Sequence, residues 1–544
     1  MRSMLQHRSG LVLILTACML TASPGSGRAQ AYDRDARVPA HGALWIELSP
    51  SWEIWNDQFA LGSATNSDGS KEPLYSDYEG PIVERLFPGM DPLLADLNRD
   101  AVALGYDSLT ATEVSLGELD YGRITKDVRR VPLGLSFGLF NRVSVDVMVP
   151  IVRGTAETTF SYDSTTANFV PSSTVFPAPD AFFGQLSSAQ EDLAALIAGG
   201  TLTPEEEAAA LVLLAGSDEF SVALEDRVIG KQLLPTGLST AGTQLTDRYS
   251  TMSDGYTAFG LTLPTLTLPD SSRSSDLQPI LGAAPIGVDS LIDTTRGWDL
   301  GEIEVGLRVL LFDTFEPITP VDEDRYRATR EPDLRGSGVR YRTTAGARLR
   351  FPVSNADDAP YLVPSSAMQQ PVGDGQTDVE FGIWQDAQFG TWLWIVGSAH
   401  YTLQLADELV MRVRDPDHPF AYTAQERTVN RNLGDLFELR LSPRFRMNET
   451  MSLGIEYKWR SKGSDEYSGD GLPDPSPLAS ESSQSRHRLG IGAYYRTTPR
   501  FAAGIANFPM ELSVVWQGSI AGGGGQTPAS DIMTLNLRVP IQLF

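Results

Sequence analysis

Cysteine is almost absent from this chain of 544 residues, and Cys18 is its one thiol, so no disulfide within the chain is available. Beyond the first thirty residues no apolar run approaches 18 residues, which excludes a transmembrane helix there. Basic residues are also scarce, 43 against 69 acidic ones, and the formal charge is −26. This acidity argues against nucleic acid as a partner and against docking on anionic lipid through a basic patch.

A signal peptide explains the apolar run at the start of the chain. Arg2 and Arg8 precede the apolar run LVLILTACMLTA. Residues Ala29 to Ala31 read AQA, which is the pattern of a cleavage site. We therefore expect residues 1–31 to be a signal peptide and 32–544 to be exported. As an alternative, Leu15 to Cys18 has the form of a lipobox, which would make Cys18 a lipidated first residue. Cleavage after Ala31 removes three arginines and no acid, which lowers the formal charge to −29.

Alternation of apolar and polar residues marks strands along the rest of the chain. Ile303, Val305 and Leu307, for example, alternate with charged or small residues, which is the period of a β-strand. Twelve such segments occur, at 43–56, 129–140, 142–153, 299–313, 339–353, 376–389, 391–404, 434–447, 450–461, 485–497, 509–519 and 530–544. No intervening segment supplies a second apolar sheet, so the apolar faces are left to lipid. The predicted fold is all-β, a transmembrane antiparallel up-and-down β-barrel of 12 strands, because a closed barrel pairs every backbone group. Fourteen strands is the alternative, with 111–125 in an additional pair.

The connections between these segments alternate between tight turns and long polar loops. The tight turns lie around Asn141, Gly390, Asn448 and 497–500, and the long connections include 57–128, 154–298, 354–375, 405–433 and 462–484. This alternation indicates short periplasmic turns and long external loops, so we expect the chain in the outer membrane of a diderm bacterium. The connection 314–338 departs from the pattern, because it falls where a turn is expected yet is long and charged.

The loop insert 154–298 is predicted to contain short helices. Ser188 to Glu191 has the form of a capping box before DLAALIA, which would end at Gly199-Gly200. Thr203 is expected to cap a second helix that has Pro204 in its first turn and ends before Gly216. Asp91-Pro92 predicts a further short helix in the first external loop. The insert is expected to form a lid, a plug folded inward, or a packed external domain without a gating role.

The inward-facing positions of the predicted barrel hold similar numbers of acids and bases. The residues predicted to line the pore are Glu302, Glu304, Arg308, Arg342, Arg348, Arg350, Asp378, Glu380, His400, Glu438, Arg440, Arg444, Arg446, Glu456, Lys458 and Arg488. Glu47, Glu53, Asp146, Asp386, Glu511, Arg460, Arg496 and Arg538 also face inward on this count. Two hypotheses follow: a structural ladder of ion pairs, or a selectivity lining in which arginines of 342–350 and 440–446 attract an anionic or aromatic solute.

Three stretches of the chain resemble a known family. They are GSGVRYRTTAGARLRFPVS, VGDGQTDVEFGIWQDAQFGTWLWIVGSAHYTL and LGDLFELRLSPRFRMNETMSLGIEYKWRS, and PLGLSFGLFNRVSVDVMVP at 132–150 is similar to the early hairpin of the same family. The family is that of outer-membrane barrels named for the meta-pathway (MetA pathway) of phenol degradation. The resemblance implies a transporter-like barrel for small aromatic or hydrophobic solutes. It departs at 351–354, where FPVS lacks the glycine expected after the proline, and in the size of 154–298.

Signals for an enzyme or a cofactor are weak. After the signal peptide only four histidines remain, and His400 alone takes an inward position. The sequence contains no phosphate-binding loop and no dinucleotide fingerprint, so we expect no enzymatic activity, no cofactor and no metal. The predicted function is an outer-membrane channel for passive passage of a small solute, with a non-conducting surface protein that displays its loops for adhesion or partner binding as the alternative.

The C-terminal segment MTLNLRVPIQLF is expected to close the barrel against the first strand. A terminal phenylalanine resembles the signal that barrels present to their assembly machinery, so that machinery is an expected partner, together with outer-membrane lipid and lipopolysaccharide. Phe544 is out of step with the apolar residues before it. We expect either a bulge near Pro540 or a Phe544 side chain that points inward.

Overall fold

The computed structural model describes most of the chain after residue 34. The described residues are 35–544 except 63–68, 84–85, 88, 289–293, 296, 316–321, 333–337, 353–374, 414–419, 421, 423–425 and 472–473. The predicted signal peptide with its cleavage and lipidation alternatives lies outside them, as does most of the Gly-Asp-Gly region before 376.

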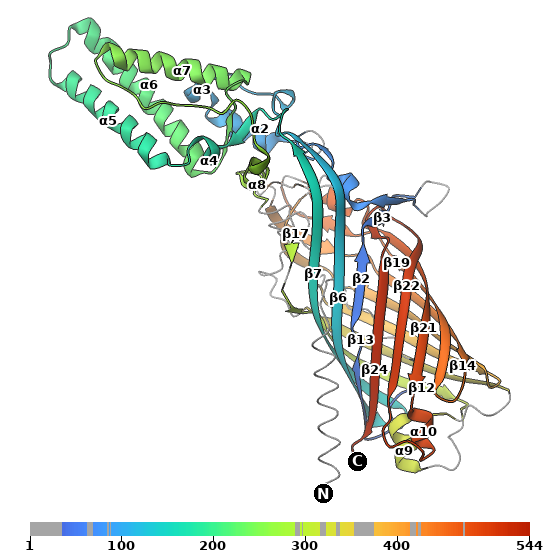
Figure 1. Cartoon of the computed structure of the whole chain (residues 1–544). Coiled ribbons are helices and arrows are strands. Elements are labelled where there is room, and N and C mark those ends of the chain that lie inside the picture. Colours follow the sequence, from blue (N-terminus) through green and yellow to red (C-terminus); the bar gives the residue numbers. More distant parts are fainter. Residues whose placement is uncertain are drawn as a thin grey trace.

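A closed antiparallel barrel of 12 strand positions forms the body of the molecule (Figure 1). β1 and β2 share the first position, and the chain closes the sheet by pairing β1 and β2 with both β6 and β24. The strands of the barrel are β1 (Ala43–Leu48), β2 (Ser51–Trp55), β6 (Glu118–Phe140), β7 (Val143–Asp163), β12 (Ile303–Asp313), β13 (Val339–Phe351), β14 (Asp378–Phe389), β15 (Leu393–Gln404), β18 (Leu436–Arg446), β19 (Met451–Lys462), β21 (Gln484–Arg496), β22 (Glu511–Gly523) and β24 (Asp531–Gln542). Closure leaves no open edge among them, as a bilayer requires.

The prediction of 12 strands is confirmed, and the alternative of 14 is wrong. β6 and β7 are each about ten residues longer than predicted and pair with one another from Phe140 and Val143 out to Glu118 and Asp163. Most of the segment proposed for an additional pair, 118–125, therefore extends β6 instead. The long hairpin continues past the other strands and carries the chain into a separate helical region (Figure 1).

The two faces of the barrel differ in chemistry. On the outer face large apolar side chains are exposed, among them Leu307, Leu349, Phe381, Leu441, Leu489 and Ile491. Side chains at the alternate positions are buried and mostly charged or polar. This arrangement is that of a barrel that places its apolar side chains in lipid and its polar ones in the lumen. Within the described part of the chain, no helix is both long enough and apolar enough to cross a membrane.

One end of the barrel, here called the turn end, carries the short connections and the C-terminus. Gly390 adopts φ +58° in the connection from β14 to β15, where the left-handed conformation makes a tight turn. The prediction of a tight turn at 497–500 is wrong, since α10 (Thr498–Ala502) forms there. The charged connection 314–338 folds in part into α9 (Glu323–Thr329), which packs against α10 and against β24. Both short helices lie at the turn end (Figure 1).

Phe544 follows neither predicted arrangement. β1 and β24 pair without a register shift from Ala43 opposite Gln542 to Leu48 opposite Leu537, so Pro540 causes no bulge. The Phe544 side chain is 70% exposed and meets the rings of His41 and Phe137 at 5.7 and 6.3 Å between centroids. The chain leaves the sheet after Gln542, which frees the last residue from the alternation of the strand.

At the opposite end, here called the loop end, lies a helical domain with an apolar core (Figure 1). It comprises α3 (Ala101–Leu104), α4 (Ser172–Val175), α5 (Pro179–Ala198), α6 (Pro204–Ile229) and α7 (Thr240–Ala258). α2 (Asp91–Arg99) and α8 (Leu277–Gly282) join it to the barrel through a second apolar cluster. Leu193, Phe220 and Leu224 are fully buried in the helical core. The insert is therefore a packed external domain and not a plug folded inward.

The predicted helix limits are right in part. Thr203 caps α6, where its hydroxyl accepts a hydrogen bond from the Glu206 amide, and α5 ends at Gly199. α6 nevertheless continues through Gly216 to Ile229, because Phe220 and Leu224 bury in the domain core. Ser188 is not an N-cap: α5 begins at Pro179, and the Ser188 hydroxyl donates to the Gly184 carbonyl one turn earlier.

Candidate functional site in the barrel lumen

The interior of the barrel is lined by ion pairs set by strand register. On three neighbouring strands Glu304 lies opposite Arg350, and Arg350 lies opposite Asp378. The Arg350 guanidinium is 3.3 Å from the Glu304 carboxylate and 2.6 Å from that of Asp378. Cross-strand neighbours on one face of a sheet are close enough for such contacts, so the alternating charges of the sequence become a ladder around the wall.

The ladder continues through neighbouring residues that the sequence also placed inside. Arg348 pairs with Glu304 at 2.8 Å and with Glu380 at 3.5 Å. His400 Nδ1 lies 2.9 Å from Oε1 of Glu380, the same oxygen that Arg348 approaches. Glu302 lies 3.8 Å from Arg350. Each cation of 348–350 thus has several acidic partners, which favours the structural-ladder hypothesis for this pair of arginines.

Two arginines reach further into the lumen. Arg308 pairs with Asp146 at 2.8 Å, and Arg342 pairs with Asp313 at 2.9 Å. Both are 2% exposed or less, so removing Asp146 or Asp313 would take from a buried guanidinium the acid nearest to it. Arg308 also packs over the Trp384 ring, 5.6 Å from its centroid.

A third group lies on β18, β19 and β21. Arg440 pairs with the buried Glu456 at 2.8 Å, and Lys458 pairs with Glu438 at the same distance. Arg444 lies 3.9 Å from the centroid of the Tyr494 ring and donates to the Ser442 hydroxyl. Arg446 donates to the Asn448 carbonyl in the turn, so it lies at the rim of the turn end.

Arg488 belongs to a separate contact. It pairs with the carboxylate of Glu53 on β2 and donates to the Ser530 hydroxyl at 2.6 Å. The structure therefore brings all sixteen predicted residues to the interior of the barrel or its rim, in several groups and not in one site.

The segment immediately before β1 folds into the lumen, which the sequence did not predict. Residues 35–40 are all buried. The Ala36 amide donates to Asp386 at 3.1 Å, the Thr344 hydroxyl donates to the Ala36 carbonyl at 2.6 Å, and Arg308 donates to the Arg37 carbonyl at 3.2 Å. This segment is here called the lumen segment (35–40). Its backbone groups make hydrogen bonds with polar side chains of the barrel interior that water would otherwise make.

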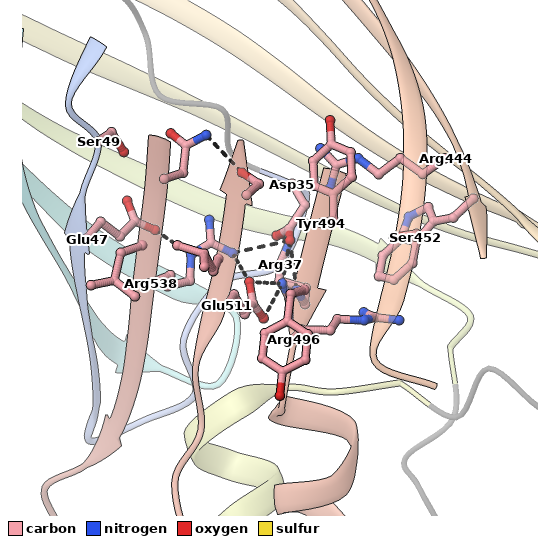
Figure 2. A pocket seen from close by; sticks show the side chains of 16 residues that line it. Asp35, Arg37, Glu47, Ser49, Arg444, Ser452, Tyr494, Arg496, Glu511 and Arg538 are labelled. Carbon is pink, nitrogen blue, oxygen red and sulfur yellow. Dashed lines mark hydrogen bonds and ion pairs between the residues drawn. The ribbon is translucent and has the colours of Figure 1, made fainter. Parts of the chain in front are cut away.

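Arg37 holds the lumen segment in place through ion pairs. Its guanidinium is 2.6 Å from Asp35, 2.7 Å from Glu511 and 3.3 Å from Glu331. Figure 2 shows Arg37, Asp35 and Glu511 converging on one cluster with Arg538. Arg538 in turn pairs with Glu47 at 2.6 Å and with Asp35 at 3.2 Å. Asp35 and Arg37 lie outside the segments of alternating polarity. The alternation that predicted the other inward-facing residues therefore could not predict these two.

Glu331 is a further residue that sequence reasoning missed. It is fully buried, pairs with Arg496 at 2.9 Å and accepts a hydrogen bond from Thr498 at 2.8 Å. It comes from the long charged connection 314–338, whose departure from the turn pattern was the available signal. That connection supplies a buried carboxylate that pairs with both Arg37 and Arg496.

Three cavities whose linings include charged and polar side chains follow one another along the lumen. The first, of about 80 Å³, is lined by the Arg37 cluster and is the one drawn in Figure 2. A second, of about 70 Å³, shares Ser49 and Asn536 with it and reaches Arg130, Lys458 and His400. A third, of about 20 Å³, shares Trp394 and Arg496 with the first and reaches Asn448 at the turn end. Each is large enough for one or a few water molecules.

Comparisons with known proteins give a distant likeness to membrane barrels. No model of a protein family matches the chain, and no curated protein matches it. An outer membrane channel from Pseudomonas putida F1 matches with a TM-score of 0.40 and 8% identity over 94% of this chain and 100% of that one. The toluene transporter TbuX of Ralstonia pickettii matches at 0.29 and 8% over 96% of each chain. The translocator domain of the autotransporter NalP from Neisseria meningitidis matches at 0.26 and 6%, over 92% of this chain and 89% of that one.

Structural similarity at TM-scores below 0.5 says nothing about the function of this chain. The fold assignment rests instead on the hydrogen-bonded closure of the sheet. The finer resemblance to the phenol-degradation family stays a prediction.

Proposed function

We propose that this protein is an outer-membrane channel for passive passage of a small solute, with its turn end in the periplasm. The observation that carries the proposal is the series of three cavities that share lining residues from the turn at Asn448 to the middle of the barrel at Arg130. A barrel that served only to anchor a domain would not need a polar route along its axis. Aromatic or hydrophobic solutes are the class that the family resemblance implies.

The lumen segment restricts this route in the proposed mechanism. Its six buried residues occupy the lumen beside the first cavity, and Arg37 is fixed there by three acids. Cavities of this size admit water or an ion of a few atoms but not an aromatic solute, so passage of an aromatic solute requires the segment to move. The Arg37 cluster sets how readily it does so, because each ion pair must exchange its partner for water.

Planar-bilayer recording of the purified, heat-modifiable protein tests the channel. We expect small conductance steps from the native protein and several-fold larger ones from the double variant Asp35→Ser, Arg37→Ser, which releases the lumen segment. A matched double variant, Glu323→Ser and Asp324→Ser, changes exposed residues of α9 and should behave as the native protein does. Absence of steps and of solute uptake into liposomes, from both the native protein and the released variant, would overturn the proposal.

The alternative is a non-conducting protein that displays its loop-end domain to a partner. The apolar core of the helical domain favours it, because a folded domain of this size exceeds what a simple loop requires. The same recordings separate the two functions. A barrel that stays silent even when the lumen segment is released would make display of the helical domain the better conclusion.

A further inference from the structure

Cations gather in the middle of the lumen in a way that the ion-pair ladder does not explain. Arg440, Lys458 and Arg488 lie directly opposite one another on β18, β19 and β21. Arg460 and Arg486 form a second like-charged pair beside them. Like charges opposite each other in a sheet are destabilising, whereas the Glu304, Arg350 and Asp378 row alternates in sign.

Arg130 adds a further cation from the opposite side of the lumen. It is 6% exposed, lies on β6 opposite Ser51, and makes no hydrogen bond or ion pair with any described residue. Its side chain lines the second cavity together with Lys458 and Arg440. Its charge interacts with Glu53 only at longer range, and Glu53 is held directly by Arg486 and Arg488. A buried guanidinium without a direct ion pair is costly, so Arg130 is suited to pair with an anion that enters the lumen.

The acids near this cavity do not compensate its cations. Glu438 lines the cavity but is already paired with Lys458, and Glu456 is paired with Arg440. Glu53 is shared by Arg486 and Arg488, and two of the nitrogens of Arg488 remain without a hydrogen bond. Three cations, Arg130, Arg440 and Lys458, line the cavity together with one carboxylate, that of Glu438. His400 adds a ring nitrogen to the lining, and Glu380 behind it is held by Arg348.

The cavity also offers neutral donors at the same level. Ser49, Ser51, Ser398, Gln517, Thr534 and Asn536 complete its lining. Hydroxyl and amide groups around a guanidinium suit an oxyanion, because a carboxylate accepts several hydrogen bonds at once. An uncharged aromatic solute would leave these donors without partners.

We propose that this cavity binds the carboxylate of a small organic anion, with Arg130 as the principal ligand and Lys458 as the second cation. The site lies on the proposed route, so as a substrate site it rests on the proposed function, but the binding itself does not. Arg348 and Arg350 play no part in it, because their acids already satisfy them. The substrate class that follows is a small carboxylic acid in its ionised form.

Calorimetric titration of the full-length protein in non-ionic detergent tests the site, with acetate as the probe, because a cavity of about 70 Å³ has no room for an aromatic ring. Acetamide is the matched control ligand, since it has nearly the same shape and no charge. We expect acetate to bind and acetamide to bind at least tenfold more weakly. Arg130→Gln should weaken acetate binding about tenfold, the loss of one charge-assisted contact, whereas Arg130→Lys should stay within threefold of the native protein.

Two controls separate a binding role from a structural one. Arg500→Gln makes the same change at an exposed position of α10 and should leave acetate binding unchanged. Arg130→Gln should keep heat-modifiable gel mobility, because it removes a cation that makes no direct ion pair with a described residue. Equal binding of acetate and acetamide, no acetate binding, or an unchanged affinity in Arg130→Gln would overturn the site. Acetate binding by a protein that never conducts would overturn the channel and leave the site standing.

Discussion

The barrel and the helical domain of this chain are built on opposite principles. The barrel exposes leucines and isoleucines such as Leu489 and Ile491 and buries arginines, whereas the helical domain buries Leu224 and Phe220 around one buried arginine, Arg227. In the domain, stability comes from removing apolar surface from water. In the barrel, lipid covers the apolar surface, so the interior is free to hold charges provided that they pair. One chain thus buries apolar surface where water surrounds it and buries charge where lipid surrounds it.

The largest expected effect comes from placing a charge in the apolar core of the helical domain. Phe220 is fully buried, 5.5 Å from the Tyr249 ring between centroids, and Phe220→Asp would bury a carboxylate in an apolar core. We expect a loss of roughly 4–5 kcal/mol or more from the domain, seen as reduced helical circular dichroism and rapid proteolysis of 172–260. The barrel should keep its heat-modifiable mobility; if that is lost too, the two regions do not fold separately.

Removing one acid from the barrel interior should cost somewhat less. Glu331→Gln deprives Arg37 and Arg496 of a buried partner, and we expect a loss of about 3–5 kcal/mol together with larger conductance steps, because the lumen segment loosens. Urea-induced unfolding of the barrel and bilayer recording measure the two effects. Glu323→Gln is the matched control on the exposed face of α9. Equal stability of the two variants would show that burial of charge is not what holds the lumen together.

A smaller effect is expected within the ladder. Arg348→Gln leaves Glu304 paired with Arg350 and Glu380 in contact with His400, so the loss should be about 1–3 kcal/mol. Its ion selectivity, measured as the reversal potential in a salt gradient, should shift less than that of Arg130→Gln. A larger shift for Arg348→Gln would restore the hypothesis that arginines of 342–350 select the solute.

The smallest expected effect concerns a surface cap of the helical domain. Hydrogen bonds from the backbone amide and then the hydroxyl of Thr203 lower the pKa of the Glu206 carboxyl. A lowered pKa in the folded state adds stability above the ordinary value, about 4.3, and this is lost as the pH falls through the folded value. Thr203→Ala should raise the pKa of Glu206 part of the way back, because the amide remains. A titration followed by NMR measures the pKa, and Thr201→Ala, two residues before the cap, should leave the pKa of Glu206 unchanged.

Much of the barrel was predictable from local pattern. The alternation of Ile303, Val305 and Leu307 determines which face of β12 meets lipid, since a strand presents successive side chains to opposite faces. Arg130 could have been found in the same way, because it is in step with buried positions such as Ser136. The helical domain was less predictable, since Gly216 and Ser188 indicated helix ends that packing overrode.

The sequence by itself determined the closed barrel, its polar interior and its apolar exterior, because these depend on a period of two residues and on the need to pair every backbone group. Only the tertiary structure decided what occupies the lumen and which charges meet there. Glu53 meets Arg488, and Asp35 meets Arg538, across more than 400 residues of chain. Such partners are set by strand register and by the path of the lumen segment, neither of which leaves a local pattern. The same structure leaves Arg130 without a direct ion pair among the described residues, and only the closed lumen shows this.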